Sequence, residues 1–243
     1  MQLSENIKET YAAQYDSNSV EWRNMGAKYK ALNIIELAKC IQFKNVLEVG
    51  AGEGSILNWL SKWNFCDDLN CVEISESGIE MIKSKQIEHL KDVLLFDGYK
   101  IPYPDNHFDL VICSHVMEHV EHERILLREI KRVSRHQIFE VPIDFSFYVD
   151  RKLKHFLSYG HINIYTPGLF RFLLMSENYE VVKDKCYLYE DEMIHPFYKN
   201  NKLGFCITKF KYLVLKTFPY LLGIKPNAYA ILTSKNEQKL TIF

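Results

Sequence analysis

The chain is organised around the stretch Val46-Leu47-Glu48-Val49-Gly50-Ala51-Gly52-Glu53-Gly54-Ser55. Its first four residues are mainly apolar, which is typical of a short strand that is covered on both faces. Glycines then occupy alternate positions, and glycine permits positive φ and lets a ligand approach the backbone closely. Apolar residues at helical spacing follow. The stretch therefore predicts a strand, a glycine turn and a helix N-terminus, which together form a nucleotide-type binding corner.

The glycine spacing indicates which ligand this corner binds. Dinucleotide-binding enzymes carry G-x-G-x-x-G, and their helix N-terminus holds a pyrophosphate. Here the spacing is G-x-G-x-G, the turn has no lysine or arginine, and Glu48 and Glu53 add negative charge. A ligand with a positive centre and no phosphate suits such a turn, and S-adenosylmethionine (SAM), a sulfonium compound, fits. A glycine turn that binds no ligand is the alternative.

Length and composition predict one globular domain over residues 1–243. With 47% hydrophobic and 25% charged residues, the chain can bury one sizeable core. Its net charge of -1 gives no long-range attraction to nucleic acid. The sequence has six cysteines with no C-x-x-C pair, polar first residues and no long uncharged apolar run, so we expect a reduced, cytoplasmic protein.

Further segments extend the first strand into an α/β pattern. We expect strands at 70–74, 93–96, 108–113, 137–142, 179–189 and 227–233, with helices between most of them. This alternation predicts a mostly parallel sheet with helices on its faces. Within the single domain we expect an N-terminal helical cap at 1–43, a SAM-binding core at 44–142 and an acceptor loop at 143–165. In the cap, Tyr11, Tyr15 and Arg23 either pack on the domain or form a lid that reaches the carboxylate of the ligand.

Two acidic residues at strand ends extend the predicted SAM site. Glu73 ends the second strand, where a carboxylate can accept both ribose hydroxyls. Asp97, followed by Gly98, ends the third strand, where an acid can reach the adenine amino group. The alternative for Glu73 is an exposed acid at a strand end.

In combination, these motifs resemble those of the class I SAM-dependent methyltransferases over residues 46–142. The matching signals are the glycine turn, Glu73, Asp97 with Gly98, and the segment 101–120, in this order. The resemblance implies a doubly wound, seven-stranded, mostly parallel sheet of Rossmann-like methyltransferase type, with a reversed final hairpin. With the lid residues included, the expected SAM contacts are Tyr11, Tyr15, Glu48, Gly50, Ala51, Gly52, Gly54, Glu73, Ile74, Asp97, Gly98, Ser114 and His115.

The expected function is transfer of the SAM methyl group to a small-molecule acceptor by an in-line displacement, which depends mainly on alignment. A hydroxyl acceptor also needs a base, and the candidates are His119, His161, His115 and Asp144. The aromatic, charged loop favours a hydroxyl or amine of a sugar or glycan precursor. A nicotinamide-dependent oxidoreductase is disfavoured because its glycine motif is absent. A SAM-binding partner or regulatory protein without catalysis is the alternative.

His115, Glu118 and His119 form an H-x-x-E-H cluster. The cluster is similar to the acid-rich metal site of some quinone-pathway O-methyltransferases, but His115 stands in place of an acid. We expect Glu118 and His119 to cap the following helix, and we expect no metal.

An insert at 190–225 separates the last two strands and mixes apolar residues with lysines. This pattern is typical of an amphipathic helix that packs on protein or lies on a membrane surface. We expect packing on the sheet edge or across a homodimer, in a chain that is a monomer or a homodimer. Weak membrane-surface contact through 202–222 is the alternative.

Overall fold

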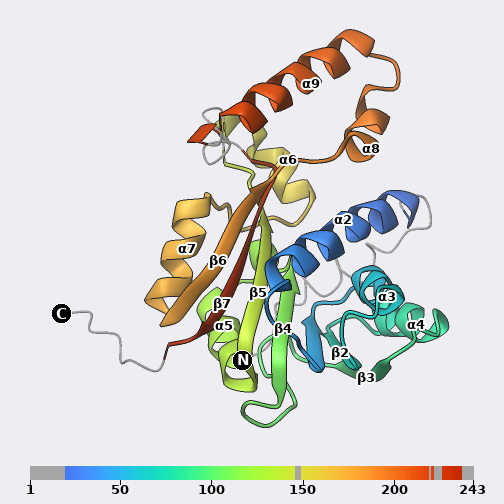
Figure 1. Cartoon of the computed structure of the whole chain (residues 1–243), viewed down its shortest axis with the longest axis vertical. Coiled ribbons are helices and arrows are strands. Elements are labelled where there is room, and N and C mark those ends of the chain that lie inside the picture. Colours follow the sequence, from blue (N-terminus) through green and yellow to red (C-terminus); the bar gives the residue numbers. More distant parts are fainter. Residues whose placement is uncertain (1–19, 146–148, 219, 222–225, 237–243) are drawn as a thin grey trace.

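The computed structural model describes residues 20–145, 149–218, 220–221 and 226–236. In that part, seven strands form one sheet in the order β3-β2-β1-β4-β5-β7-β6, with helices on both faces (Figure 1). β7 is antiparallel to β5 and β6, and the other neighbouring strands pair in parallel. The predicted doubly wound fold with a reversed final strand is confirmed. The strands are β1 (Asn45–Val49), β2 (Asp68–Glu73), β3 (Leu90–Leu95), β4 (Phe108–Ser114), β5 (Ser134–Pro142), β6 (Tyr179–Tyr187) and β7 (Ala228–Lys235).

Helices α2, α3 and α4 pack on one face of the sheet, and α5 and α7 pack on the other. The alternation of side chains along each buried strand produces this division. On β4, for example, Leu110 and Ile112 join the core under α2, whereas Val111 and Cys113 join the core under α5. The α-helices described are α2 (Val20–Ala38), α3 (Ser55–Lys62), α4 (Glu76–Ser84), α5 (Glu123–Val133), α6 (Leu153–Ser158), α7 (Pro167–Ser176), α8 (Asp191–Ile194) and α9 (Lys202–Thr217).

The helix starts follow local capping chemistry, with one correction. Thr166 caps α7 by accepting the Leu169 N–H at 3.1 Å, as its sequence position before Pro167 predicts. The prediction that Glu118 and His119 cap the next helix is wrong. They lie in a separate 3-10 turn, η2 (Met117–His119), and α5 begins later, after His122.

The insert lies at the carboxyl edge of the sheet, because α8, the 3-10 turn η4 (His195–Tyr198) and α9 follow the end of β6. Figure 1 shows α8 and α9 as a lobe beyond that edge, drawn in orange and red. Tyr29 of α2 donates a hydrogen bond from its hydroxyl to Glu192 Oε2 of α8 at 2.9 Å, which joins the cap to the insert. Within the described residues, no helix is both long enough and apolar enough to cross a membrane.

Candidate functional site

The glycine turn adopts the backbone conformation that its sequence predicts. Gly50, Gly52 and Gly54 have φ values of 71°, 57° and 75°, in the left-handed region that favours glycine. A Cβ at Gly50 would lie 2.5 Å from Val116 Cγ2, so the turn after β1 directly contacts the segment after β4. Any larger residue at this position would separate the two segments.

Glu73 fixes this turn from β2. Its side chain is buried, and Oε2 accepts the Gly52 N–H at 2.7 Å while Oε1 accepts the Ser75 N–H at 3.0 Å. Burial raises the pKa of Glu73, although these backbone donors oppose the effect. A carboxylate offers about four lone-pair positions, so the predicted contacts with ribose hydroxyls are compatible with both bonds.

Glu53 has a different role from the one expected, and it pairs with Arg23 of the cap helix. The Glu53 carboxylate is buried and pairs with Arg23 Nη2 at 3.3 Å and with Lys85 Nζ at 3.8 Å. Glu53 therefore does not present an uncompensated charge to a ligand, because two cations from α2 and from the end of α4 surround it. Arg23 makes this ion pair, and its contact with a ligand carboxylate, one of the two alternatives for the cap, stays a prediction. Tyr11 and Tyr15 lie outside the described residues.

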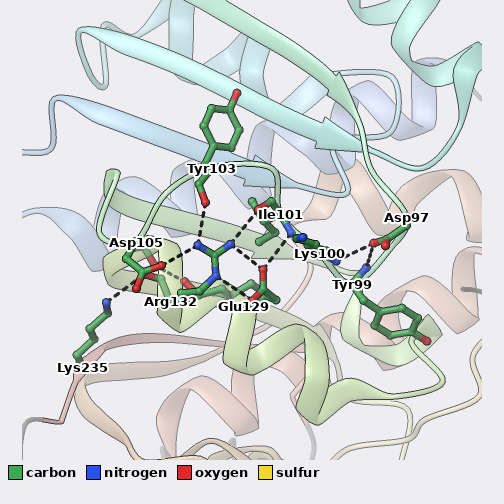
Figure 2. Close-up of polar contacts among 11 residues, drawn as sticks. Asp97, Tyr99, Lys100, Ile101, Tyr103, Asp105, Glu129, Arg132 and Lys235 are labelled. Carbon is green, nitrogen blue, oxygen red and sulfur yellow. Dashed lines mark hydrogen bonds and ion pairs between the residues drawn. The ribbon is translucent and has the colours of Figure 1, made fainter. Parts of the chain in front are cut away.

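Asp97 caps a turn at the end of β3. The carboxylate is exposed, and Oδ1 accepts the Tyr99 and Lys100 N–H groups at 2.9 and 2.7 Å (Figure 2). A cavity of about 620 Å³ lies between loop 97–104 and α5, and Arg132 forms one wall by donating to the Ile101 and Tyr103 carbonyls (Figure 2). Among the described residues, its lining includes Asp97, a predicted SAM contact, but no residue of the glycine turn. The adenine contact of Asp97 and Gly98 stays a prediction.

A group of buried carboxylates lies at the carboxyl ends of β1, β4 and β5. Glu48 is 2% exposed, its Oε2 accepts no hydrogen bond within the part described, and burial raises its pKa to about 8. Lys30 of α2 interacts electrostatically with Glu140, Glu118 and Glu48, and burial lowers its pKa. Asn33, one turn further along α2, donates to Glu140 Oε2 at 3.0 Å. The cap helix therefore supplies a lysine and an amide to this carboxylate group.

His115 links two of these carboxylates. Nε2 lies 3.2 Å from Glu140 Oε1, and Nδ1 lies 3.4 Å from Glu118 Oε1. Burial and Lys30 oppose its protonation, but the two glutamates outweigh them and raise the pKa of His115. The residue has a φ of 56°, which turns the chain sharply after β4. Next to it, the Oγ of Ser114 is buried without a hydrogen-bond partner among the described residues.

His119 and His161 form a second group beside Glu118. Nδ1 of His161 lies 2.6 Å from Asp144 Oδ2, and Nδ1 of His119 lies 2.9 Å from the Gly160 carbonyl oxygen. The two rings pack edge to face with centroids 4.9 Å apart. Burial lowers the pKa of His119, which favours its neutral form. The structure therefore brings together all four residues predicted as catalytic candidates. His115 and His119 lie next to Glu118, and His161, which contacts Asp144, packs against His119.

Lys30, Asn33 and Glu140 are the residues of this site that sequence reasoning did not identify. Glu140 offered a signal, because a charged residue inside the apolar fifth strand needs a partner or a ligand. Lys30 and Asn33 offered no comparable signal, since polar residues on an amphipathic helix usually face solvent.

The residues present fit SAM. The glycine cradle admits a ligand close to the backbone, and Glu48 Oε2 and Ser114 Oγ are buried polar atoms without hydrogen-bond partners among the described residues. The buried carboxylates suit the sulfonium and ammonium charges of SAM.

Comparisons with known proteins agree with this geometry. A family model described as a methyltransferase domain matches residues 47–137. The chain is 27% identical over 135 residues to UbiE of Burkholderia cenocepacia, a ubiquinone/menaquinone biosynthesis C-methyltransferase, covering 51% of this chain and 52% of that protein. It is also 27% identical to YrhH of Bacillus subtilis, a putative methyltransferase, covering 53% and 71%. The chain thus spans about half the length of the UbiE relatives it matches.

A solved structure shares the fold. A SAM-dependent methyltransferase from Thermotoga maritima, titled a possible histamine N-methyltransferase, superposes with a TM-score of 0.63 at 14% identity, covering 95% of this chain and all of that one. The family model matches the segment that carries the glycine turn, Glu73 and the β4 motif. The match over residues 47–137 and the shared fold therefore identify this part of the chain as a methyltransferase domain of the class I SAM-dependent type.

Proposed function

We propose that this chain is an enzyme that transfers the methyl group of SAM to a hydroxyl or amine of a small-molecule acceptor, with a sugar or glycan precursor as the acceptor class. The main observation in support is the direct contact between the glycine turn after β1 and the segment after β4 that carries His115 and His119. Gly50 of the cofactor turn abuts Val116, and His115 and His119 lie in that same short segment. A methyl donor held by the turn would therefore lie beside the histidine cluster.

SAM, when bound, supplies a methyl carbon made electrophilic by the attached sulfonium. The acceptor oxygen forms a bond to this carbon as the carbon–sulfur bond breaks, the sulfur keeps the electron pair, and the acceptor proton must leave. His119 and His161 are the groups that take up this proton, directly or through a water bound between them. Asp144 fixes the orientation of the His161 ring through the 2.6 Å contact.

Formation of S-adenosylhomocysteine with a panel of hydroxyl and amine acceptors tests this proposal. His161→Asn should lower turnover at least ~100-fold, the scale of general-base effects, without weakening S-adenosylhomocysteine binding. His155→Asn is the matched control, because His155 is an exposed histidine of α6. If the chain binds SAM but produces no S-adenosylhomocysteine with the panel or with a small-molecule cell extract, a non-catalytic SAM-binding protein is favoured.

A carbon acceptor is the second candidate, because the UbiE relatives are named C-methyltransferases. Mass spectrometry and NMR of the methylated product distinguish carbon, nitrogen and oxygen acceptors.

We also propose that α9 contacts an anionic membrane surface. Residues 195–221 contain five lysines and no acidic residue. Tyr212 and Leu215 of α9 are buried with Ile194, whereas Leu203, Ile207 and Phe210 share an exposed face, so the expected packing covers only one side of the helix. Anionic lipid would complement the lysines of this segment, which carries no acidic residue.

A further inference from the structure

Glu118 lacks the partners that a buried carboxylate normally has. Its side chain is 1% exposed, and no described residue donates a hydrogen bond to Oε1 or Oε2. The nearest charged neighbours are His115 Nδ1 at 3.4 Å and His119 Nε2 at 3.9 Å, both measured to Oε1. His115 offsets part of the charge of Glu118, but both carboxylate oxygens remain without a hydrogen bond that meets the usual geometry, so the position can accept a further cation.

Two imidazoles complete a set of three donors around one point. One carboxylate oxygen of Glu118 and one ring nitrogen each of His119 and His161 lie within 4.8 Å of one another. Ligands of a zinc ion lie about 2.0–2.2 Å from the metal, so a modest side-chain adjustment would bring all three onto one ion. Two imidazoles with one carboxylate form a typical donor set for Zn²⁺ or a similar transition metal.

The hydrogen-bond partners of His119 and His161 determine which ring nitrogen of each would bind a metal ion. The Gly160 carbonyl can only accept, so Nδ1 of His119 carries the proton and the lone pair of the neutral ring lies on Nε2. Asp144 Oδ2 likewise accepts from Nδ1 of His161. Metal-binding histidines commonly donate their second nitrogen to a carboxylate or a backbone carbonyl in this way.

The backbone that carries these ligands is tied together across the chain. The Ile162 and Asn163 N–H groups both donate to the Glu118 carbonyl, at 2.9 and 3.0 Å. The Asn163 side chain donates to the Met117 and Val120 carbonyls at 3.0 and 2.7 Å. The segment with His161 is therefore fixed against the turn with Glu118 and His119, which preorganises the three donors.

We infer that Glu118, His119 and His161 bind a divalent transition-metal ion at the acceptor end of the site, with Asp144 as the positioning residue for His161. This inference rests on the proposed function, since an ion there would bind and acidify the acceptor hydroxyl or a water beside it. With the ion bound, the Nε2 atoms of both histidines would be ligands, so the histidines would act through the ion and the acceptor proton would pass to solvent. Three carboxylates (Glu118, Glu140 and Asp144) surround the region, where Lys30 and His115 supply positive charge, so the local charge tolerates a cation.

Metal binding by the full chain tests the inference with Zn²⁺ and Co²⁺ as probes. Cys40 and Cys206 are exposed thiols that can bind zinc adventitiously, so the measurements use a Cys40→Ser/Cys206→Ser background. After chelator treatment, we expect one Zn²⁺ per chain by calorimetry and visible absorption bands on Co²⁺ loading. Glu118→Gln and His161→Asn should each weaken binding more than ~100-fold, and Asp144→Asn about 10- to 100-fold. His155→Asn should bind as the parent does.

The inference fails if the parent binds no metal, or if binding persists in both Glu118→Gln and His161→Asn while these variants still bind S-adenosylhomocysteine. It also fails if the chelated, metal-free chain turns over SAM as fast as the loaded chain, a result that leaves the proposed methyl transfer intact. Stoichiometric metal binding lost in both variants, without SAM turnover, would uphold the metal site and reject the methyl transfer.

Discussion

Glu73 combines a structural contact with a predicted ligand contact. It holds the Gly52 and Ser75 N–H groups, and it is the expected acceptor for the ribose hydroxyls. Glu73→Ala should weaken S-adenosylhomocysteine binding by roughly 1.5–3 kcal/mol, the range for hydrogen bonds to charged groups. It should also lower the free energy of unfolding, because the Gly52 N–H loses its acceptor. Calorimetry and urea unfolding measure both effects. Glu76→Ala, at an exposed acid of α4, is the control, and an unchanged dissociation constant in folded Glu73→Ala would show that Glu73 does not contact the ligand.

Glu48 makes the stability of the ligand-free chain depend on pH. Burial raises its pKa to about 8, above the value of an unfolded glutamate. The stabilising contribution of the protonated form is therefore complete below the unfolded pKa and is lost as pH rises towards 8. Between pH 5 and 8 the free energy of unfolding should fall about 1 kcal/mol per pH unit more steeply in the parent than in Glu48→Gln. Urea unfolding across this range measures the two slopes. Glu180→Gln, on exposed β6, should keep the parent slope, and equal slopes in Glu48→Gln and the parent would contradict the buried-acid interpretation.

At the scale of single elements, α4 must approach the glycine turn closely. A Cβ at Gly78 would lie 2.7 Å from the Gly52 carbonyl oxygen and 3.1 Å from Glu73 Cγ. Gly78→Ala should therefore destabilise the chain by about 1–3 kcal/mol, despite the better helix propensity of alanine, and weaken S-adenosylhomocysteine binding. Gly168→Ala in α7 is the matched control, because its Cβ would have only Thr166 Oγ1 nearby, at 4.0 Å. Thermal unfolding and calorimetry compare the two variants. An equal response in both would mean that the close approach has no energetic role.

The α9 surface is tested by co-sedimentation with phosphatidylglycerol and phosphatidylcholine vesicles. Binding to the anionic vesicles should weaken with salt, and it should be lost in Phe210→Asp. Phe172→Asp in α7 is the matched control, since Phe172 is 67% exposed and Phe210 is 68% exposed. Failure to bind anionic vesicles would reject membrane contact. If light scattering then showed a dimer that Phe210→Asp dissociates, the face would be a homodimer interface.

At the scale of the whole molecule, the sequence predicts the sheet better than it predicts the cap and the insert. Continuous apolar runs such as Leu110 to Cys113 are typical of strands that are covered on both faces, so each strand can be predicted from its own sequence. The glycine turn can be predicted from the sequence because a backbone with positive φ favours glycine. The exposure of one apolar face of α9 could not be predicted, because an apolar stripe on a helix indicates burial without specifying which surface covers it.

The site is only partly predictable for a related reason. Residues at the strand ends of one βαβ unit follow from spacing, as Glu73 does. The cluster of Glu118, His119 and His161 depends on the fold of loop 143–165, which brings His161 back to η2, and no local pattern predicts that return. The pairing of Arg23 with Glu53 is likewise a tertiary contact. It compensates the negative charge that the sequence alone assigns to the glycine turn.

The most direct test of the central claim is a calorimetric titration of the full chain with SAM, repeated with NAD under the same conditions. The glycine spacing, Glu73 and the methyltransferase-domain match over residues 47–137 predict one saturable SAM site per chain and no binding of NAD. Saturable NAD binding without SAM binding would contradict the assignment of this site.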